Sequence, residues 1–190
     1  LALRAQRLDP SLVPAALVAA RVYSAEGYPK KAVRVLQETW RRNPHPDLAE
    51  VMAHVKPGEG PEPRFERVRD LVNGHAGGLE GAYALARAAG LAQRWDVARK
   101  ALDPYLADQP QARVCALMAD IEEASGDKGR AREWLSRALR ARRDPMWLAD
   151  GVASPRWTPV SPVSGEIVPC EWKAPFEMPE QPEADRLTEQ

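Results

Sequence analysis

The chain has 190 residues, 44% of them hydrophobic, which is enough for one ordinary domain or a short repeat array with a buried core. Its 27 Lys and Arg residues balance its 27 Asp and Glu residues, and the absence of a basic surplus argues against nucleic-acid binding and against a polybasic membrane attachment. The two cysteines are too few for a disulfide framework or a four-thiolate zinc site, and they indicate a reducing compartment.

The first ten residues, LALRAQRLDP, form a helical pattern that ends at a proline. No stretch reaches the roughly 18 to 20 uninterrupted apolar residues of a membrane span, and no signal peptide is present. Because the chain begins inside this pattern and without Met, we expect a fragment of a longer protein, in which a membrane anchor would precede Leu1. Residues 1–10 then fit the second helix of an earlier repeat.

Prolines and alanines recur along the chain with a period of about 33 residues. Helix-ending prolines stand at Pro10, Pro44, Pro110 and Pro145, which lie one, two and one periods apart, with Pro145 slightly late. The small residue that opens the second helix after a turn keeps this phase at Ala32, Ala98 and Ala131, which lie two periods and then one period apart. The period indicates repeated helical hairpins. An ordinary helical bundle is the alternative, because alanine-rich helices that end at proline are common.

A helix, a tight turn and a second helix at this period resemble the tetratricopeptide repeat. Its small, aromatic, turn and terminator positions are matched in the first copy by Ala16, Ala19, Ala20, Tyr23, Gly27, Ala32, Leu36 and Pro44. Later copies match it at Ala82, Leu85, Ala86, Ala98, Leu102 and Pro110, and at Met118, Ala119, Gly126, Ala131, Leu135 and Ala138. The resemblance implies hairpins whose helices approach closely through small residues, with large residues filling the gap to the next hairpin.

The copy between the first and third hairpins is degenerate. DLAEVMAHV and RFERVRDLV place apolar residues at helical spacing, but KPGEGPEP between them predicts a longer, exposed loop. We therefore predict an all-α fold over residues 1–146, a right-handed superhelix of tetratricopeptide-repeat type. It comprises a half repeat at 1–10 and about four hairpins, near 12–44, 46–78, 79–110 and 111–145.

Residues 147–175 are predicted to form an irregular, Pro/Trp-rich C-terminal cap. The prolines between residues 154 and 175 exclude a long helix. We expect Trp147, Trp157 and Trp172 to be buried against the last hairpin, because a free segment would not expose several large apolar side chains in a row. The acidic, Pro-rich residues 176–190 are expected to be disordered.

The motif SPVSG would read as the zinc knuckle C-P-x-C-G if Ser161 and Ser164 were cysteines. Ala149 and Val152 have the same spacing, so two knuckle-like turns flank Trp157. Serine and alanine hold zinc poorly, since a hydroxyl stays protonated at neutral pH. The segment is therefore either a degenerate zinc ribbon held by hydrophobic packing or an unrelated Pro-rich turn, and no metal site is predicted.

The alanine-rich repeats, followed by DPMWLADGVASPRWTPVSPVSGEIVPCEWKAP, resemble the C-terminal part of the proteobacterial HemY family. The resemblance implies the soluble part of a membrane-anchored protein that is associated with late haem and porphyrin biosynthesis. It also implies the bacterial inner membrane as the location, with this region facing the cytoplasm, and haem-biosynthesis enzymes as partners. Flavin-dependent oxidase activity is not expected, because the chain lacks a glycine-rich dinucleotide loop.

No pattern in the sequence indicates an enzyme, since a Ser, His and acid arrangement, a phosphate loop and a metal-ligand cluster are all lacking. Asp120, Glu122 and Glu123 are expected to form a solvated acidic face on one helix. Candidate haem ligands are His45, His54, His75, Cys115 and Cys170. Turn and packing positions account for these residues, so we expect no cofactor. A haem or porphyrin carrier and an adaptor in envelope assembly are the alternative functions.

The remaining candidate site is the concave face of the array, which the first helix of each hairpin lines. The repeat register directs eight side chains toward it: Leu17, Arg21, Glu50, His54, Tyr83, Arg87, Asp120 and Glu123. Because this surface mixes both charges, we expect it to bind a helix or an extended protein segment with paired charges. The sequence thus predicts a non-catalytic scaffold for protein partners, with an inert spacer as the alternative.

Overall fold

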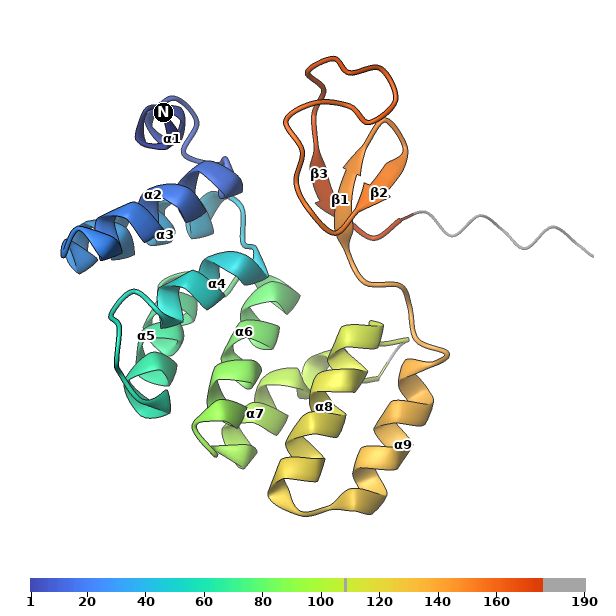
Figure 1. Ribbon diagram of the computed structural model, residues 1–190. Coiled ribbons are helices and arrows are strands. Elements are labelled where there is room, and N and C mark those ends of the chain that lie inside the picture. Colours follow the sequence, from blue (N-terminus) through green and yellow to red (C-terminus); the bar gives the residue numbers. More distant parts are fainter. Residues whose placement is uncertain (108, 176–190) are drawn as a thin grey trace, which may run out of the picture. The chain divides into compact units, whose positions relative to one another are not determined.

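The computed structural model describes residues 1–107 and 109–175 (Figure 1). The chain divides into two compact units, the first being Leu1–Arg142 and the second beginning at Arg143. The first unit is helical and the second contains a small sheet. A mostly helical protein is thus confirmed, whereas the expectation of an all-α chain is wrong. The tail expected to be disordered, 176–190, lies outside the described residues.

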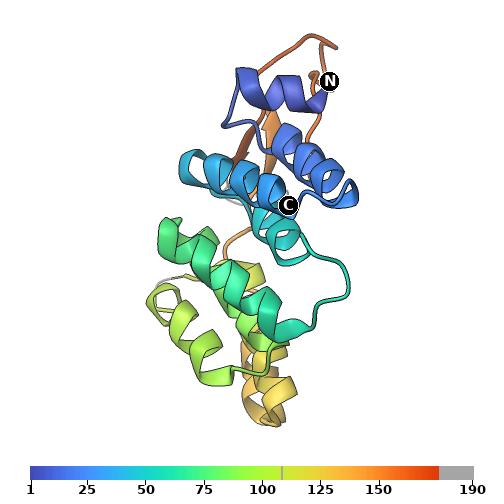
Figure 2. The ribbon, with the colours of Figure 1, turned by 90° about the vertical axis from the view of Figure 1, so that its left-hand side faces the viewer.

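The first unit contains nine α-helices within the described range, and most of them pack as consecutive pairs. The helices are α1 (Ala2–Leu8), α2 (Val13–Ala25), α3 (Pro29–Arg42), α4 (Pro46–Ala53), α5 (Pro61–Gly74), α6 (Gly78–Leu91), α7 (Trp95–Leu102), α8 (Ala112–Ser125) and α9 (Lys128–Ala138), with a 3-10 turn at Asp103–Tyr105. Helix α1 packs on α2, and the pairs α2 and α3, α4 and α5, α6 and α7, and α8 and α9 each form a hairpin. Figure 2 shows that the hairpins follow one another in chain order along the unit.

Proline begins three of these helices, α3, α4 and α5. The first-turn N–H groups of a helix have no intrahelical partner, so proline costs no hydrogen bond there. Helix α5 accordingly starts at Pro61 and accepts Pro63 in its first turn. A loop longer than the other hairpin turns is present, but it covers residues 54–60, and the last three residues of KPGEGPEP belong to α5.

The turn between the two helices of a hairpin recurs with one geometry in three hairpins. An N–H group donates to the carbonyl five residues earlier from Tyr28 to Tyr23 (2.7 Å), from Arg94 to Ala89 (2.8 Å) and from Asp127 to Glu122 (2.8 Å). The preceding residues Gly27, Gln93 and Gly126 have φ values of 78°, 57° and 101°. These left-handed positions, two periods and then one period apart, end the first helix and reverse the chain.

Small residues let the helices of each hairpin approach. Ala32 and Ala98 are fully buried and Ala131 is 5% exposed. Each alanine lies in the first turn of the second helix of its hairpin. Its N–H group donates to the carbonyl oxygen of the N-cap residue of that helix, which is Tyr28, Arg94 or Asp127. A larger side chain at these positions would separate the two helices.

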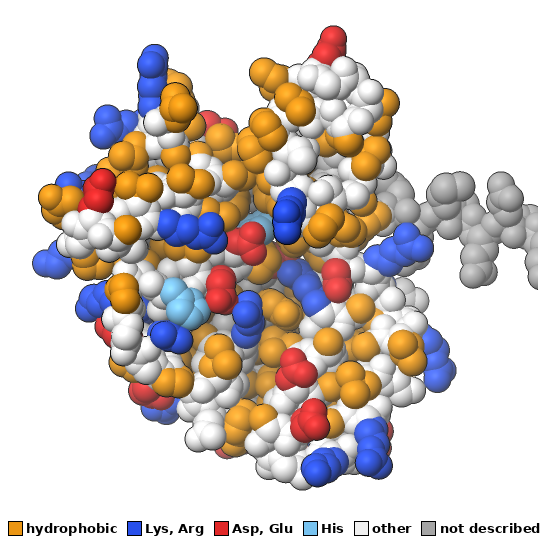
Figure 3. Space-filling view, viewed as in Figure 1, with side chains coloured by type: hydrophobic (Ala, Val, Ile, Leu, Met, Phe, Trp, Pro, Cys, Tyr) orange, Lys and Arg blue, Asp and Glu red, His pale blue; other side chains and the backbone are white. Residues whose placement is uncertain are grey.

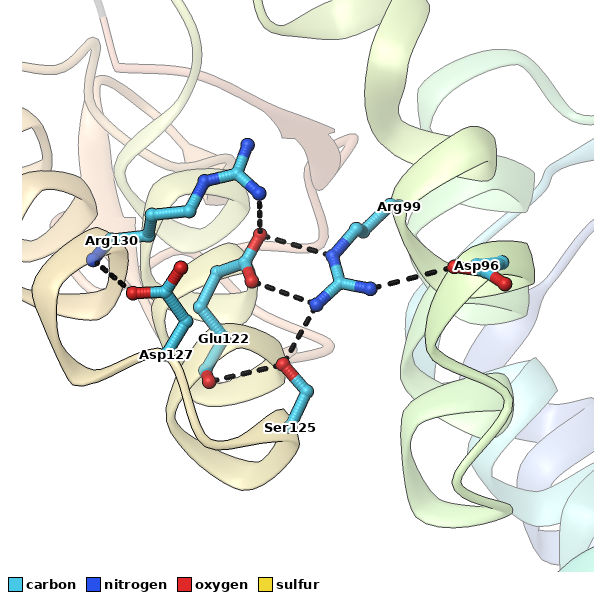
Figure 4. A network of polar contacts seen from close by, with 6 residues as sticks. All are labelled: Asp96, Arg99, Glu122, Ser125, Asp127 and Arg130. Carbon is cyan, nitrogen blue, oxygen red and sulfur yellow. Dashed lines mark hydrogen bonds and ion pairs between the residues drawn. The ribbon is translucent and has the colours of Figure 1, made fainter.

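An ion pair with a buried carboxylate joins the third hairpin to the fourth (Figure 4). The Arg99 guanidinium on α7 donates to both carboxylate oxygens of Glu122 on α8, at 3.1 and 2.8 Å, and to the Ser125 hydroxyl at 2.7 Å. Glu122 is fully buried, so its expected place on a solvated face is wrong. The hydrogen bonds from Arg99 hold the pKa of Glu122 below its usual value.

The second unit contains three short antiparallel strands, β1 (Met146–Ala149), β2 (Val152–Ser154) and β3 (Glu171–Lys173), in the order β2-β1-β3. Asp150 and Gly151 both have positive φ, 49° and 75°, which is the two-residue hairpin turn that Asp-Gly favours. The expected irregular cap is therefore partly a sheet. Prolines exclude long helices, but strands of three or four residues fit between them.

Tryptophan packing and one serine hold this unit together. Trp147 on the central strand pairs with Trp172 on β3, and their ring centroids are 5.5 Å apart. The buried Ser161 hydroxyl accepts the N–H groups of Val163 (3.0 Å) and Ser164 (3.1 Å). These hydrogen bonds close the SPVSG turn around an oxygen atom. The interpretation of this segment as a degenerate zinc ribbon stays a prediction. The docking of Trp157 on the last hairpin also stays a prediction.

Substitution of Ala98 by leucine should destabilise the first unit by about 1–3 kcal/mol, because the added side chain overpacks the helix contact. Urea unfolding followed by circular dichroism at 222 nm measures the loss. Lys100→Leu adds the same side chain to the exposed face of the same helix and should change the stability little. Equal losses from the two variants would contradict the packing argument.

Substitution of Ser161 by alanine should destabilise the second unit by about 1 kcal/mol, since the N–H groups of Val163 and Ser164 lose their acceptor. The exciton signal of the Trp147 and Trp172 pair in far-ultraviolet circular dichroism reports the unfolding of this unit. Val163→Ala, at a position that is 70% exposed, is the control and should have little effect. Unchanged unfolding of Ser161→Ala would show that the turn does not need the hydroxyl.

Candidate functional site

Two adjoining hollows lie along the first helices of successive hairpins. The first, of about 100 Å³, lies among α4, α5 and α6, and the second, of about 240 Å³, lies among α6, α7 and α8. Tyr83, Arg87 and Leu91 line both. Helix α6 contacts α4 on one side and α8 on the other, so the two hollows adjoin along α6, and the surface that they make together is called the groove. Figure 3 shows this face, with hydrophobic side chains exposed between charged ones.

The floor of the groove is apolar and shallow. Small side chains on α4 and α6 line it, and they are Ala49, Ala53, Ala84 and Ala88. Because alanines let the helices pack closely, they also leave a depression that larger residues would fill. Leu91 is 63% exposed at the boundary of the two hollows and offers an apolar contact to a ligand.

Opposite charges meet across the groove between α4 and α6. The Arg87 guanidinium lies 3.0 Å from one carboxylate oxygen of Glu50, and the His54 Nδ1 atom lies 3.4 Å from the other. His54 Nδ1 also lies 2.9 Å from the Glu50 carbonyl oxygen. All three side chains are 43–47% exposed, so they can exchange these contacts for contacts with a ligand at little cost.

A less exposed ion pair fixes α6 against α8 beside the groove. Arg113 on α8 donates to both carboxylate oxygens of Glu80 on α6, at 2.8 and 2.5 Å. The same guanidinium lies 5.0 Å from the ring centroid of Tyr83. The pair therefore holds Tyr83 in place where the two hollows join.

The structure brings most of the predicted groove residues together. Glu50, His54, Tyr83 and Arg87 line the first hollow, and Tyr83, Arg87 and Asp120 line the second.

The other three predicted residues, Leu17, Arg21 and Glu123, line neither hollow. Glu123 is exposed on α8, and Leu17 and Arg21 lie on α2. Burial raises the pKa of Asp47, while the charges of Arg21 and Arg87 lower it. Arg21 thus lies within electrostatic reach of the same end of the groove.

Sequence reasoning missed Arg64, Leu91 and Trp95, which also line the groove. Leu91 lies four residues after Arg87, so helical spacing alone could have placed it on the same face. Arg64 and Trp95 lie on second helices, which the repeat register assigns to the outer layer. No pattern in the sequence pointed to them.

The candidate haem ligands differ in their exposure to solvent. Residues 1–107 and 109–175 contain no group of three or more His, Cys, Asp or Glu side chains placed to hold a metal ion. His45 and Cys115 are buried, Cys170 is half-buried, and His54 and His75 are exposed. Over the same residues, no helix has the length and apolar character of a membrane span.

His45 instead begins helix α4. Its Nδ1 atom accepts the N–H of Asp47 at 3.1 Å, which satisfies one donor of the first turn. Burial lowers the pKa of His45 to about 4, with Glu80 raising it and Arg113 lowering it by smaller amounts. The imidazole is therefore neutral in the folded protein at neutral pH.

Comparison with known proteins gives one informative similarity. No family model matches the chain. It is 29% identical over 176 residues to the "Probable magnetosome protein Mms48" of Magnetospirillum gryphiswaldense. The alignment covers 90% of this chain and 39% of the relative, so the chain spans about two fifths of that protein's length.

This similarity overturns the HemY assignment. The relative is named for the magnetosome, and nothing in the comparisons indicates HemY, haem biosynthesis or porphyrin metabolism. The assignment to the tetratricopeptide repeat is likewise not supported by any family model. The closing segment misled because Trp147, Asp150, Gly151 and Ser161 serve the small sheet and its turns. Residues that a local fold requires carry little information about function.

Stability should fall as the pH drops from about 6.5 to about 4, because the unfolded chain takes up a proton at His45 that the folded protein does not. Above pH 6.5 both states are neutral at this residue and its contribution is complete. At pH 5 the loss should be about 2 kcal/mol. Urea unfolding at pH 7 and pH 5 measures it.

His45→Asn is the matched control, since asparagine also caps a helix but does not titrate. The free energy of unfolding should change between pH 7 and pH 5 by about 2 kcal/mol less in this variant than in the wild-type protein. An equal pH dependence in the two proteins would mean that other groups cause it.

Proposed function

We propose that Leu1–Arg142 is a right-handed superhelical array of repeated hairpins that acts as a non-catalytic scaffold and binds a protein segment along α4, α6 and α8. The observation that carries the proposal is that the two hollows adjoin along α6. Tyr83, Arg87 and Leu91 belong to both hollows, so one ligand can contact three successive hairpins. The recurrence of one turn geometry at whole multiples of the repeat period supports the repeat array.

The ligand is a helix or an extended segment with apolar side chains and charges of both signs. The alanine floor accommodates apolar side chains, and Leu91 adds an exposed one. Arg64 and Arg87 can receive carboxylates, whereas Glu50 and Asp120 can receive basic groups. A surface of this kind selects a charge pattern as well as an apolar sequence.

We place the scaffold at a membrane. The name of the relative refers to the magnetosome, a membrane-enclosed organelle, and the similarity covers most of this chain. The partner is accordingly a protein of a membrane-associated assembly.

Selection of peptides from a random dodecamer display library against the whole chain tests the groove. The wild-type protein and Lys30→Glu, a control at an exposed position of α3, should enrich the same peptides. Arg87→Glu should weaken their binding about tenfold or more, because it removes one cation and adds a charge beside Glu50. Thermal unfolding should be nearly the same in all three proteins, since Arg87 is exposed.

Two results would contradict the proposal. One is a lack of enrichment on the wild-type protein, which would favour the spacer alternative. The other is equal binding by Arg87→Glu, which would move the ligand away from the groove.

A further inference from the structure

The last hairpin exposes leucines whose counterparts in earlier hairpins are buried. Leu36, Leu102 and Leu135 lie two periods and then one period apart on α3, α7 and α9. The first two are fully buried and Leu135 is 51% exposed. One helical turn later, Trp40 is fully buried whereas Leu139, three periods further along the chain, is 88% exposed.

The following hairpin explains the burial of the earlier positions. Helix α3 packs against α4, and α7 packs against α8, which are the first helices of the next hairpins. Helix α9 is the last helix of Leu1–Arg142 and has no such neighbour within that unit. Its leucines therefore form an open stacking face.

An arginine on this face of α9 corresponds to the arginine of α7 that pairs with α8. Arg99 on α7 pairs with the buried Glu122 of α8. Arg132 lies one repeat period after Arg99 on α9, is exposed, and has no ion pair with a carboxylate of residues 1–107 or 109–175. Arg132 thus occupies the position of Arg99 without a counterpart to Glu122.

The open face is basic as well as apolar. Lys128, Arg132 and Leu135 follow one another in steps of four and three residues and so share one side of α9, and Leu139, the C-cap residue with helical φ and ψ, continues that side. Arg140 and Arg142 lie close by in sequence and are exposed, while Glu133 is the one acidic residue from 128 to 142. The balanced net charge of the chain conceals this local surplus.

We propose that Arg132, Leu135 and Leu139 form a docking face for an acidic amphipathic helix of a partner protein. The partner helix packs on α9 as α8 packs on α7, and one of its carboxylates pairs with Arg132 as Glu122 pairs with Arg99. This face is separate from the groove of the proposed function. A nucleic acid would leave the leucines without a role, and the internal contact supplies a direct template for a helix.

A peptide with the sequence of α8, Ala112–Ser125, is the probe, because this helix covers the equivalent face of α7. A lactam bridge between positions 116 and 120, away from Glu122, keeps it helical. Titrated into the ¹⁵N-labelled whole chain, it should shift the amide signals of Arg132, Leu135 and Leu139. Glu122→Gln in the peptide or Arg132→Glu in the protein should weaken binding about tenfold.

A charge exchange tests the pairing itself. The peptide with Glu122→Arg should bind the Arg132→Glu protein better than it binds the wild-type protein. The groove variant Arg87→Glu should bind the original peptide as the wild-type protein does, so failure of the groove proposal and failure of this one are distinguishable.

Stability measurements show whether the face is open in the free chain. Leu135→Asp should leave the thermal midpoint unchanged, whereas Leu102→Asp, at the equivalent buried position, should lower it strongly. A large loss in Leu135→Asp would mean that the same chain already covers the face, and would overturn the proposal.

Three further results would overturn it. The first is a lack of peptide binding, and the second is binding that Arg87→Glu abolishes. The third is that the protein binds phosphatidylglycerol vesicles but not the peptide, and that Leu139→Ser and Arg132→Glu both abolish vesicle binding. The face would then bind a membrane surface.

Discussion

The close approach of two helices at a single alanine is the constraint on which the first unit depends. Ala32, Ala98 and Ala131 are buried at the same point of three hairpins, directly after a turn of the same geometry. In these three hairpins the turn and the alanine fix how the second helix leaves the first, so the second helices α3, α7 and α9 present comparable faces. The open side of α9 is recognised by comparison with the covered faces of α3 and α7.

The sequence predicted what depends on spacing and missed what depends on single contacts. The hairpins and five of the eight groove residues follow from the periodic pattern. Glu122 reads as a solvated carboxylate in the sequence, because its partner Arg99 lies 23 residues away on another helix. One dipeptide in the sequence, Asp150-Gly151, favours a β-hairpin turn in the second unit. The many prolines nearby indicate irregular structure instead. Local turn chemistry deserved more weight there than composition.

Composition also concealed the distribution of charge. Equal numbers of acidic and basic residues describe the whole chain, yet residues 128–142 are strongly basic and the groove carries both signs. Electrostatic attraction acts over roughly a Debye length of about 8–10 Å, so a partner responds to the local surface and not to the total. A chain of zero net charge can therefore offer two surfaces with different electrostatic character.

The Ser161 turn has a consequence for the conditions under which the second unit folds. Zinc bound by thiolates contributes about 10–16 kcal/mol to the folding of small metal domains, and a hydroxyl that accepts two N–H groups contributes only a fraction of that. In exchange, a serine needs no metal supply and does not oxidise. The tryptophan pair and the Asp-Gly hairpin must provide the remaining stability. The closure of the SPVSG turn therefore needs neither a zinc ion nor a reduced thiol at position 161.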